Sequence, residues 1–551
     1  MGLIERRIGL LFAVFLGLLA IGATKAAWLG VVRAGTLQRA ATTQQEADVT
    51  LPARRGSITD DHGIELAVSE PAFDVAATPY LIKDAPAVAA KLAPLLGKPE
   101  DELLRQLARR DTGFAYLARR VPAGKADQAK QLKIAGLEFI PEYRRAYPLN
   151  WTASQLVGSV GTDGQGLSGL EYSLDSKLKG TDGERRMVKD AVGTPLEMRD
   201  TTPVKRGETV RLTLDKRLQD RAEEVLADVG RTWQPKGATA IVMDPNTGAV
   251  LALANWPRVD ANSPGGSPDY ARGNRAIGAT YESGSTFKAF TVAAALEDGK
   301  VAPDTTFSIP PVLQVADRQI HDAENHGYVT MTTKEILKQS SNIGAVLIAK
   351  RVDTTSFDSW IHRFGFGKKT GIDLPGEEQG IVTPLSKYSG STMGNLPIGQ
   401  GIAVTPMQMA AGYAAIANGG VLRAPHIVAA VGGKKKPLPA GKRVISEATA
   451  ASVRSMLEGV LGPGGTASGA AIQGYQLAGK TGTAQKPDPK GGYSLTRYVA
   501  SFVGFAPAKN PKLLAAVMVD EPKGEIYGGQ VAAPAWKQIM NFAVQYLKIS
   551  P

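Results

Sequence analysis

The chain has 551 residues, 43% of them hydrophobic, a formal net charge of +12 and no cysteine. This length exceeds one ordinary hydrophobic core and predicts about two or three folded domains. The lack of cysteine excludes disulfides and thiolate chemistry, and it suits an oxidising compartment where a free thiol is a liability. The basic residues are dispersed along the chain, which argues against a nucleic-acid partner and favours a solubilising surface charge, with attraction to anionic lipid or polymer left open.

An uncharged apolar segment near the amino terminus predicts a membrane span. Residues 8–24 carry no charge, and the apolar run continues beyond one lysine to residue 32. This length reaches the lower limit for a helix that crosses a bilayer. Arg6 and Arg7 precede the run, so the positive-inside rule predicts a cytoplasmic amino terminus and an extracytoplasmic remainder. A cleaved signal peptide is the alternative, but its apolar region would be shorter.

The segment that follows changes its pattern several times. Residues 33–50 are polar and glutamine-rich, which predicts a tether or a continuing helix at the membrane surface. Alternating apolar residues broken by a turn predict a hairpin over residues 54–64. Helical spacing of apolar residues indicates an inserted helical subdomain over residues 79–140. Crowded glycines over residues 158–183 predict tight turns that join short strands, and residues 185–199 again favour strands.

A second region begins near residue 208. A strand over residues 210–214 and a helix over residues 218–229 precede two strands that flank the turn 244–248, which predicts a β-hairpin after a helix. Later elements are strands at 501–505 and 513–519 and an amphipathic helix at 536–547. An antiparallel sheet with helices predicts an α/β (α+β) sandwich. The expected parts are a tail at 1–7, a transmembrane anchor at 8–32, a linker at 33–50, a first domain at 51–207 with its insertion at about 79–140, and a second domain at 208–551.

Three short boxes in the second domain carry chemistry. They are Ser285-x-x-Lys288, Ser340-x-Asn342 and Lys480-Thr481-Gly482-Thr483. A serine hydroxyl needs a nearby base to become a nucleophile, and a lysine three positions along a helix lies on the face of the serine. Ser285 opens an apolar stretch that ends at Gly299, so we expect a buried helix with the serine at its start. Together the boxes predict a serine acyl-transfer site.

Local context separates these boxes from two similar ones. Ser176-x-x-Lys179 lies among charged residues, as in a solvated turn or helix end, and Lys369-Thr370-Gly371 follows a glycine-punctuated stretch typical of a surface loop. Lys480 instead lies in a glycine-interrupted segment before a strand, which predicts a strand closely approached by another group. Ser340 falls between two helical patterns.

The histidines offer no rival site. None of the five stands in a pattern that suggests a triad with serine and aspartate. His321, Asp322 and His326 resemble a loose metal cluster, but their spacing matches no known ligand geometry. We therefore predict no metal and no cofactor. The histidines are His62, His321, His326, His362 and His426.

The three boxes are a known signature of penicillin-binding proteins and class A β-lactamases. The chain resembles a class B penicillin-binding protein over nearly all of its length. The pair Ser341-Asn342 is similar to the division-specific, FtsI-like branch, since elongation-type relatives more often carry aspartate in the third place of that box. One departure from the family pattern is Asp61-His62, which replaces the common Arg-Asn before Gly63. Further similar segments lie at residues 55–60, 143–148, 169–171, 243–248, 404–408 and 527–534.

The resemblance implies a fold, an activity and a location. The fold would be one transmembrane helix, an elongated β-rich pedestal with a helical insertion, similar to the family's dimerisation domain, and a transpeptidase domain like the serine β-lactamases. The activity would be D,D-transpeptidation of peptidoglycan stem peptides that end in D-Ala-D-Ala, in septal wall synthesis, with β-lactams as inhibitors. The protein would lie in the bacterial inner membrane with its catalytic domain in the periplasm. Its partners would be an FtsW-like polymerase of the SEDS family and other divisome proteins.

The resemblance also assigns roles to the three boxes. Ser285 would attack the substrate carbonyl, and Lys288 would take its proton. Ser340 would relay a proton to the leaving amine, while Asn342 would bind the acyl-chain amide and steady Lys288. In the third box, Lys480 would supply positive charge, Thr481, Gly482 and Thr483 would bind the substrate and its carboxylate, and the backbone N–H groups of Ser285 and Thr483 would form the oxyanion hole.

Other functions stay open. An elongation- or sporulation-type transpeptidase would share the boxes, as would a D,D-carboxypeptidase that uses water as the acceptor. A β-lactamase would need a general base for deacylation, and the nearest candidates, Glu377 and Glu378, lie in a stretch where a solvated turn is expected. The non-enzyme alternative is a β-lactam receptor or division scaffold, although the residues before the span are too few for a receptor's output module.

Overall fold

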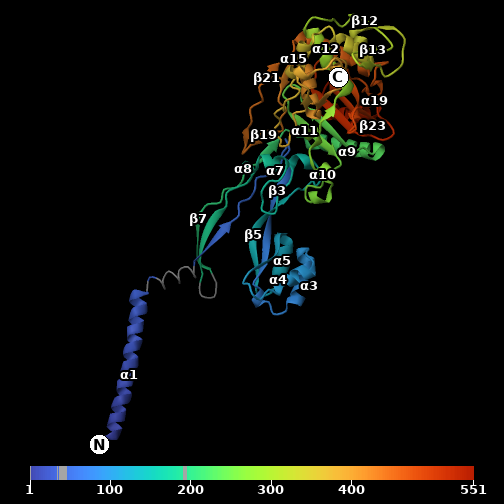
Figure 1. Cartoon of the computed structure of the whole chain (residues 1–551). Coiled ribbons are helices and arrows are strands. Elements are labelled where there is room, and N and C mark those ends of the chain that lie inside the picture. The colour runs from blue at the N-terminus through green and yellow to red at the C-terminus, as the bar shows by residue number, and fades with distance from the viewer. Residues whose placement is uncertain (1, 34, 36–45, 190–194) are drawn as a thin grey trace. The chain divides into compact units, whose positions relative to one another are not determined.

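The structure is a computed structural model that describes residues 2–33, 35, 46–189 and 195–551 (Figure 1). The residues form two compact units. The first comprises Met1–Arg54, Pro71–Tyr143 and Gly180–Arg206, and the second comprises Arg55–Glu70, Arg144–Lys179 and Gly207–Pro551. Two stretches of the expected pedestal therefore pack with the larger, carboxy-terminal unit.

The amino-terminal helix has the dimensions of a membrane span. Helix α1 (Leu3–Ala27) continues into a π-helical turn, η1 (Trp28–Val32). Ile4–Val32 covers 29 residues; its most apolar 18-residue window has a mean hydropathy of 2.1, and none of that window is buried. About 20 apolar residues are enough to cross the hydrocarbon core of a bilayer. The helix therefore suits the single-pass anchor expected from the sequence.

The expected tether ends earlier than the sequence suggested. Most of it, residues 34 and 36–45, lies outside the described residues. Strand β1 (Glu46–Leu51) follows and pairs with β6 (Gly183–Lys189), which pairs with β7 (Pro195–Thr202) in an antiparallel sheet. The expectation of a tether or helix up to residue 50 is wrong there, because the partner strand comes from far along the chain. The strands expected over residues 185–199 are confirmed.

A second layer of the smaller unit combines helices with strands. Strand β3 (Glu65–Ala77) pairs with β5 and, through its last residues, with β4. Leu92, Leu103, Leu107 and Val121 are buried in the core between helices and strands. The helical insertion is confirmed for three helices, but strand β4 was missed because its alternating pattern is short. These elements are α3 (Ala85–Leu96), α4 (Glu100–Leu107), β4 (Ala115–Pro122), α5 (Ala123–Gln131) and β5 (Leu137–Ala146).

The larger unit is built on a five-stranded antiparallel sheet with the strand order β10-β9-β24-β23-β22. Residues of β9, β10, β23 and β24 enter two separate cores. In β9, Ile241 faces one core and Val242 the other, so both faces of the sheet are buried. Strand β22 forms one end of the sheet and pairs only with β23 among the strands of this sheet. The strands are β9 (Gly237–Met243), β10 (Val250–Trp256), β22 (Ala478–Pro487), β23 (Tyr493–Ala506) and β24 (Leu513–Asp520).

Helices cover both faces of this sheet. Helices α9 (Lys216–Trp233) and α19 (Gly528–Tyr546) pack together against β9, β10, β23 and β24 (Figure 1). Helix α17 (Pro406–Ala417) packs against β9, β23 and β24 from the other core. The β-hairpin after a helix is confirmed by α9, β9 and β10. The last helix begins earlier than expected because Thr483 Oγ1 accepts a hydrogen bond from the Gly528 N–H and so caps its first turn.

Buried helices form the second core of this unit. Helix α12 (Lys288–Glu297) contacts α14 (Asn342–Ala349), α13 (Thr333–Gln339) and α18 (Glu447–Leu461). An aromatic cluster fixes its start: the Phe290 ring centroid lies 4.9–5.5 Å from four other aromatic rings. These belong to Phe287, Phe364, Phe366 and Tyr413. The two helical patterns expected on either side of Ser340 are confirmed.

The segment over residues 158–183 contains the predicted tight turns, but helices replace part of the predicted strands. Helices α7 (Gly169–Ser173) and α8 (Asp175–Leu178) lie in it, α6 (Ser154–Val157) precedes it, and two isolated bridges involve Val160 and Thr181. The expectation of strands was wrong there because the glycines of the segment serve close backbone packing: a Cβ on Gly158 would lie 1.9 Å from the Ser168 carbonyl oxygen. Ser176 is exposed on α8, as the helix-end interpretation predicted.

Smaller elements complete the unit. One sheet combines β3 with β2 (Ile58–Thr59), β8 (Val210–Leu212), β19 (Val428–Val431) and β20 (Lys434–Lys435). A three-stranded sheet contains β11 (Tyr281–Glu282), β17 (Ile402–Val404) and β16 (Ile381–Val382). Three strand pairs are β12 (Thr306–Ile309) with β15 (Val329–Thr332), β13 (Leu313–Val315) with β14 (Arg318–Ile320), and β18 (Val421–Arg423) with β21 (Gly441–Arg443). The remaining α-helices are α10 (Asp269–Arg272), α11 (Arg275–Gly278), α15 (Thr354–Arg363) and α16 (Thr392–Asn395). The 3-10 turns of this unit are η3 (Pro264–Gly266), η4 (Gly284–Phe287), η5 (Leu385–Lys387), η6 (Leu396–Ile398) and η7 (Ser468–Ala470), whereas η2 (Pro79–Leu81) belongs to the smaller unit.

A buried ion network gives a stability prediction. Glu171 on α7 is fully buried and accepts hydrogen bonds from Arg55 Nε at 2.7 Å and Arg145 Nε at 2.5 Å. Glu171→Gln would leave two buried guanidinium groups without their shared carboxylate, so we expect a loss of about 3–5 kcal/mol. Thermal unfolding of the full chain in detergent measures the change. Asp101→Asn, which removes an exposed pair with Arg105, is the control and should leave the melting temperature nearly unchanged; equal losses in both variants would contradict the prediction.

Candidate active site

The first box lies where a 3-10 turn becomes a buried helix. Ser285 belongs to η4, and α12 begins directly after it at Lys288, whose N–H donates to the Ser285 carbonyl. Ser285 is half-buried, whereas Lys288 is 1% exposed. The expectation of a serine at the start of a buried helix is thus confirmed.

Strand β22 supports the turn that carries Ser285. Gly284 has φ +54°, and a Cβ there would lie 2.9 Å from the Thr483 carbonyl oxygen. Gly482 is equally tight, since a Cβ there would lie 3.0 Å from the Ser283 carbonyl oxygen. From the other side, Tyr413 Oη donates to the Thr286 carbonyl at 2.6 Å. The glycines therefore let η4 lie directly on β22, as the glycine-interrupted pattern around Lys480 predicted.

The second box lies between the end of α13 and the start of α14. Ser340 has a left-handed backbone with φ +64°, a conformation that costs a residue other than glycine about 1–3 kcal/mol. Its carbonyl oxygen accepts from Lys288 Nζ at 2.5 Å, and its Oγ lies 3.3 Å from the same atom. Asn342 Oδ1 accepts from Lys288 Nζ at 2.7 Å. Three residues predicted from two of the boxes, Lys288, Ser340 and Asn342, therefore meet at one amine.

These contacts suit a lysine that acts as a base. Burial lowers the pKa of Lys288 from 10.5 to about 7, while the Asp322 carboxylate acts in the opposite direction. A neutral amine has two N–H donors and one lone pair. The Ser340 carbonyl and Asn342 Oδ1 accept the two protons, which leaves the lone pair for a hydroxyl. Lys288 can therefore accept a proton at neutral pH.

The lysine of the third box is also buried. Lys480 is 0% exposed, and its Nζ donates to the carbonyl oxygen and Oγ1 of Thr481, both at 3.3 Å. Burial, followed by repulsion from Lys288, lowers the pKa of Lys480 well below its ordinary value. In the free site, the protonated form of Lys480 is therefore disfavoured, although its expected role requires a positive charge.

The two threonines of the third box differ in their contacts. Thr483 Oγ1 accepts from the Gly528 N–H at 3.0 Å, so its own hydroxyl proton stays available to a ligand. Thr481 Oγ1 shares a hydrogen bond of 2.8 Å with Thr466 Oγ1. The roles of both threonines in carboxylate binding, and of the Ser285 and Thr483 N–H groups as the oxyanion hole, stay predictions.

Sequence reasoning missed several supporting residues. Asp322 accepts hydrogen bonds from the Ser341 hydroxyl and from the first N–H groups of α14, although it was interpreted only as part of a loose metal cluster. Thr466 and Gly528 support the third box from distant positions. Their contacts with the boxes could not be predicted from the sequence, because each residue reaches the site from another part of the chain. Within the described ranges, no group of three or more histidines and acidic residues is arranged to hold a metal.

The second Lys-Thr-Gly lies in a loop, as predicted, but the glutamate near it is not solvated. Glu377 is 6% exposed and accepts hydrogen bonds from the N–H and hydroxyl of Thr370 and from the Gly371 N–H. The expectation of a solvated turn is therefore wrong for Glu377, because its carboxylate satisfies the backbone of the neighbouring loop. These contacts occupy the carboxylate in a structural role.

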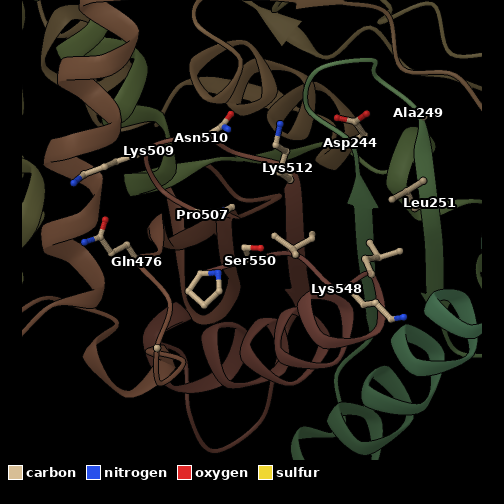
Figure 2. Close-up of a pocket in the computed structure, with 14 residues that line it drawn as sticks. Asp244, Ala249, Leu251, Gln476, Pro507, Lys509, Asn510, Lys512, Lys548 and Ser550 are labelled. Carbon is tan, nitrogen blue, oxygen red and sulfur yellow. The ribbon is translucent and has the colours of Figure 1, made fainter.

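One large cavity lies away from the boxes. It has a volume of about 950 Å³ and is lined by residues that include Asp244, Gln476, Lys512 and Lys548 (Figure 2). None of its lining residues belongs to the three boxes. The predicted catalytic residues, Ser285 and Lys288, therefore lie outside this cavity.

Comparison with protein families decides the identity. Residues 238–541 match the model of the penicillin binding protein transpeptidase domain, and residues 50–212 match that of the penicillin-binding protein dimerisation domain. The chain belongs to the penicillin-binding protein transpeptidase family. The expected α/β fold, with an amino-terminal apolar helix and a transpeptidase domain, is confirmed.

Individual relatives agree with this assignment. The peptidoglycan D,D-transpeptidase FtsI of Escherichia coli is 34% identical over 100% of this chain and 93% of its own length. The probable peptidoglycan D,D-transpeptidase PenA of Neisseria meningitidis serogroup A is 33% identical over 91% of this chain and 86% of its own. The crystal structure of penicillin-binding protein 3 from Mycobacterium tuberculosis with aztreonam has a TM-score of 0.72 and 31% identity, and covers 91% of this chain and 98% of that one.

The protonation of Lys288 predicts how acylation of this penicillin-binding protein depends on pH. A protonated amine cannot accept the Ser285 proton, so the rate constant for acylation by penicillin should rise as the pH increases through about 7. Stopped-time labelling over a pH series measures this rate constant. Lys369→Ala, in the second Lys-Thr-Gly, should keep the same profile. A rate that is equal on both sides of this pH would contradict the assignment of Lys288 as the base.

Proposed function

We propose that the protein is a peptidoglycan D,D-transpeptidase that forms an acyl-enzyme at Ser285. The observation that carries the proposal is the buried Lys288 amine, held by Ser340 and Asn342 at the start of the helix that follows Ser285. Membership of the family and the relatives named as D,D-transpeptidases support the same reaction. The occupied carboxylate of Glu377 speaks against a β-lactamase, which needs a free base for deacylation.

The reaction begins when Ser285 Oγ attacks the carbonyl carbon of the penultimate D-alanine and Lys288 Nζ takes the hydroxyl proton. The backbone N–H groups of Ser285 and Thr483 stabilise the oxyanion, a contribution of roughly 3 kcal/mol for a typical donor. Ser340 Oγ, 3.3 Å from Lys288 Nζ, passes the proton to the departing D-alanine amine. An amine of a neighbouring stem peptide then attacks the acyl-enzyme, regenerates the Ser285 hydroxyl and leaves a cross-link.

The substrate carboxylate has a specific effect on Lys480 in this proposal. Thr483 retains a hydroxyl proton that can be donated to the carboxylate. A negative charge at this point favours the protonated form of the buried Lys480. Lys480 then carries the positive charge that its role requires, although the free site disfavours that charge. Substrate binding would thus complete the charge arrangement of the site.

The proposal extends to location and partners. The α1 helix would anchor the protein in the bacterial inner membrane, with Arg6 and Arg7 on the cytoplasmic side and the catalytic unit in the periplasm. Similarity to FtsI over the whole chain favours septal wall synthesis beside an FtsW-like SEDS polymerase and other divisome proteins. The pair Ser341-Asn342 in the second box favours the same branch.

Covalent labelling tests the acyl-enzyme. Fluorescent penicillin should label the wild-type protein in membranes and remain bound during a chase, because Ser285 is acylated and Glu377, the base considered for deacylation, is occupied by Thr370 and Gly371. Ser285→Ala should lose the label. Ser176→Ala, in the second Ser-x-x-Lys, should keep it in full. Label that survives in Ser285→Ala would reject the assignment, and label lost within seconds from the wild type would indicate a β-lactamase.

Depletion in cells tests the septal role. Cells of the source bacterium that lose this protein should continue to grow but fail to divide, because septal cross-linking stops while side-wall synthesis continues. Microscopy during depletion distinguishes this outcome from rounding, which would indicate an elongation-type enzyme. Complementation by Ser285→Ala would instead favour a scaffold role.

A further inference from the structure

Asp322 joins the loop between β14 and β15 to the second box. Its side chain is 8% exposed, and Oδ1 accepts hydrogen bonds from the N–H groups of Asn342 at 2.5 Å and Ile343 at 3.0 Å. Oδ2 accepts from the Ser341 hydroxyl at 2.7 Å. The same loop receives Asn342 directly, since Asn342 Nδ2 donates to the His321 carbonyl at 2.8 Å. One carboxylate therefore fixes the residue between Ser340 and Asn342 and the start of α14.

His326 completes this arrangement with a positive charge. Its Nε2 lies 3.0 Å from Asp322 Oδ2, and its Nδ1 lies 2.6 Å from the Gly327 carbonyl oxygen. Both partners can only accept, because Asp322 already receives three donors as a carboxylate. Donation through both ring nitrogens requires the imidazolium form, so this geometry favours a positively charged ring. The Gly327 carbonyl and then Asp322 raise the pKa of His326, in agreement with this geometry.

We infer that Asp322 and His326 form a charged positioning pair that holds the Ser-Ser-Asn box against Lys288 and sets the charge balance around this base. The inference rests on the proposed acyl-enzyme function and extends it to two residues that touch neither substrate nor Ser285. Asn342 Oδ1 and the Ser340 carbonyl are the two acceptors of the Lys288 amine, so a shift of this box would move the base.

Charge links the pair to Lys288 as well. The charged groups that face the amine are Asp322, from the β14–β15 loop, and Lys480, from β22. Asp322 favours the protonated form of Lys288, and Lys480 in its cationic form opposes it. His326 lies behind Asp322 and offsets part of its negative charge. Removal of the negative partner and removal of the positive partner should therefore change the protonation of Lys288 in opposite directions.

Opposite shifts of the pH profile in the two variants would distinguish this charge effect from a purely structural role. The rate constant for acylation of Ser285 by fluorescent penicillin is measured against pH in the full-length protein. Asp322→Asn should move the acidic limb to lower pH and reduce the plateau about 10- to 100-fold through misplacement of the box. His326→Gln keeps a donor for Asp322 but loses the charge, so its acidic limb should move to higher pH. Asp317→Asn, an exposed aspartate in the β13–β14 turn, is the matched control and should follow the wild type.

The outcomes separate this inference from the proposed function. Acidic limbs that stay at the wild-type position in both variants, or move in the same direction, would overturn the charged pair. If Asp322 variants fail to fold, the direction of the His326→Gln shift still decides.

Hydrogen exchange gives a second readout that needs no activity. The amides of residues 342–343 should lose protection in Asp322→Ala but not in Asp317→Asn, and unchanged protection would overturn the positioning role. A wild-type protein that takes no label would refute the proposed function, while the exchange result would still decide for or against the pair.

Discussion

Two lysine amines lie in one buried site, and burial limits the number of protons that they can hold together. The proposed chemistry depends on this limit. Lys288 is 1% exposed and Lys480 is 0% exposed, burial lowers the pKa of both, and Lys288 lowers the pKa of Lys480 further. Like charges in a low-dielectric site cannot both be retained without strong compensation. The nearest compensation is asymmetric, because Lys288 has Asp322 nearby whereas the hydrogen bonds of Lys480 end on neutral oxygen atoms. This asymmetry is a property of the fold around the boxes and not of the boxes themselves.

The fold brings the two amines together by placing a helix start on the edge of a sheet. Strand β22 is an edge strand of the five-stranded sheet. The turn η4 lies directly on β22 because Gly284 and Gly482 place no side chain between the two backbones. The second box reaches the same point through a left-handed residue, Ser340, whose strain is tolerated because α13 ends and α14 begins on either side of it. Buried aromatic packing around Phe290 then keeps α12 in place.

The sequence predicted local features well and distant partners badly. The helix after Ser285, the helices around Ser340 and the hairpin after α9 followed from periodicity and turn residues, which act over a few positions. Strand β1 and the helices between Gly158 and Leu178 did not, because their structure depends on β6 and on a buried ion network.

The same distinction holds at the site. The boxes identified Lys288 and Asn342, but Asp322 lies in a loop that precedes the second box, and its role appears only when that loop packs on α14. For Glu377 the error is the opposite one. The composition of its segment predicted a solvated turn, but the carboxylate is buried because Thr370 and Gly371 donate hydrogen bonds to it. Side chains that satisfy buried backbone groups are therefore the part of the site that sequence patterns do not reveal.

Proton counting connects the free site with the proposed reaction. If the two amines together hold a single proton, the site has two states, with the proton on Lys288 or on Lys480. Only the second state leaves a base for Ser285. A substrate carboxylate beside Thr483 lies on the Lys480 side of the site and favours this state, and the resulting cation in turn disfavours protonation of Lys288. On this argument, the base is activated most fully when a substrate with a carboxylate is present, so the buried pair of lysines links recognition of the substrate to the first chemical step.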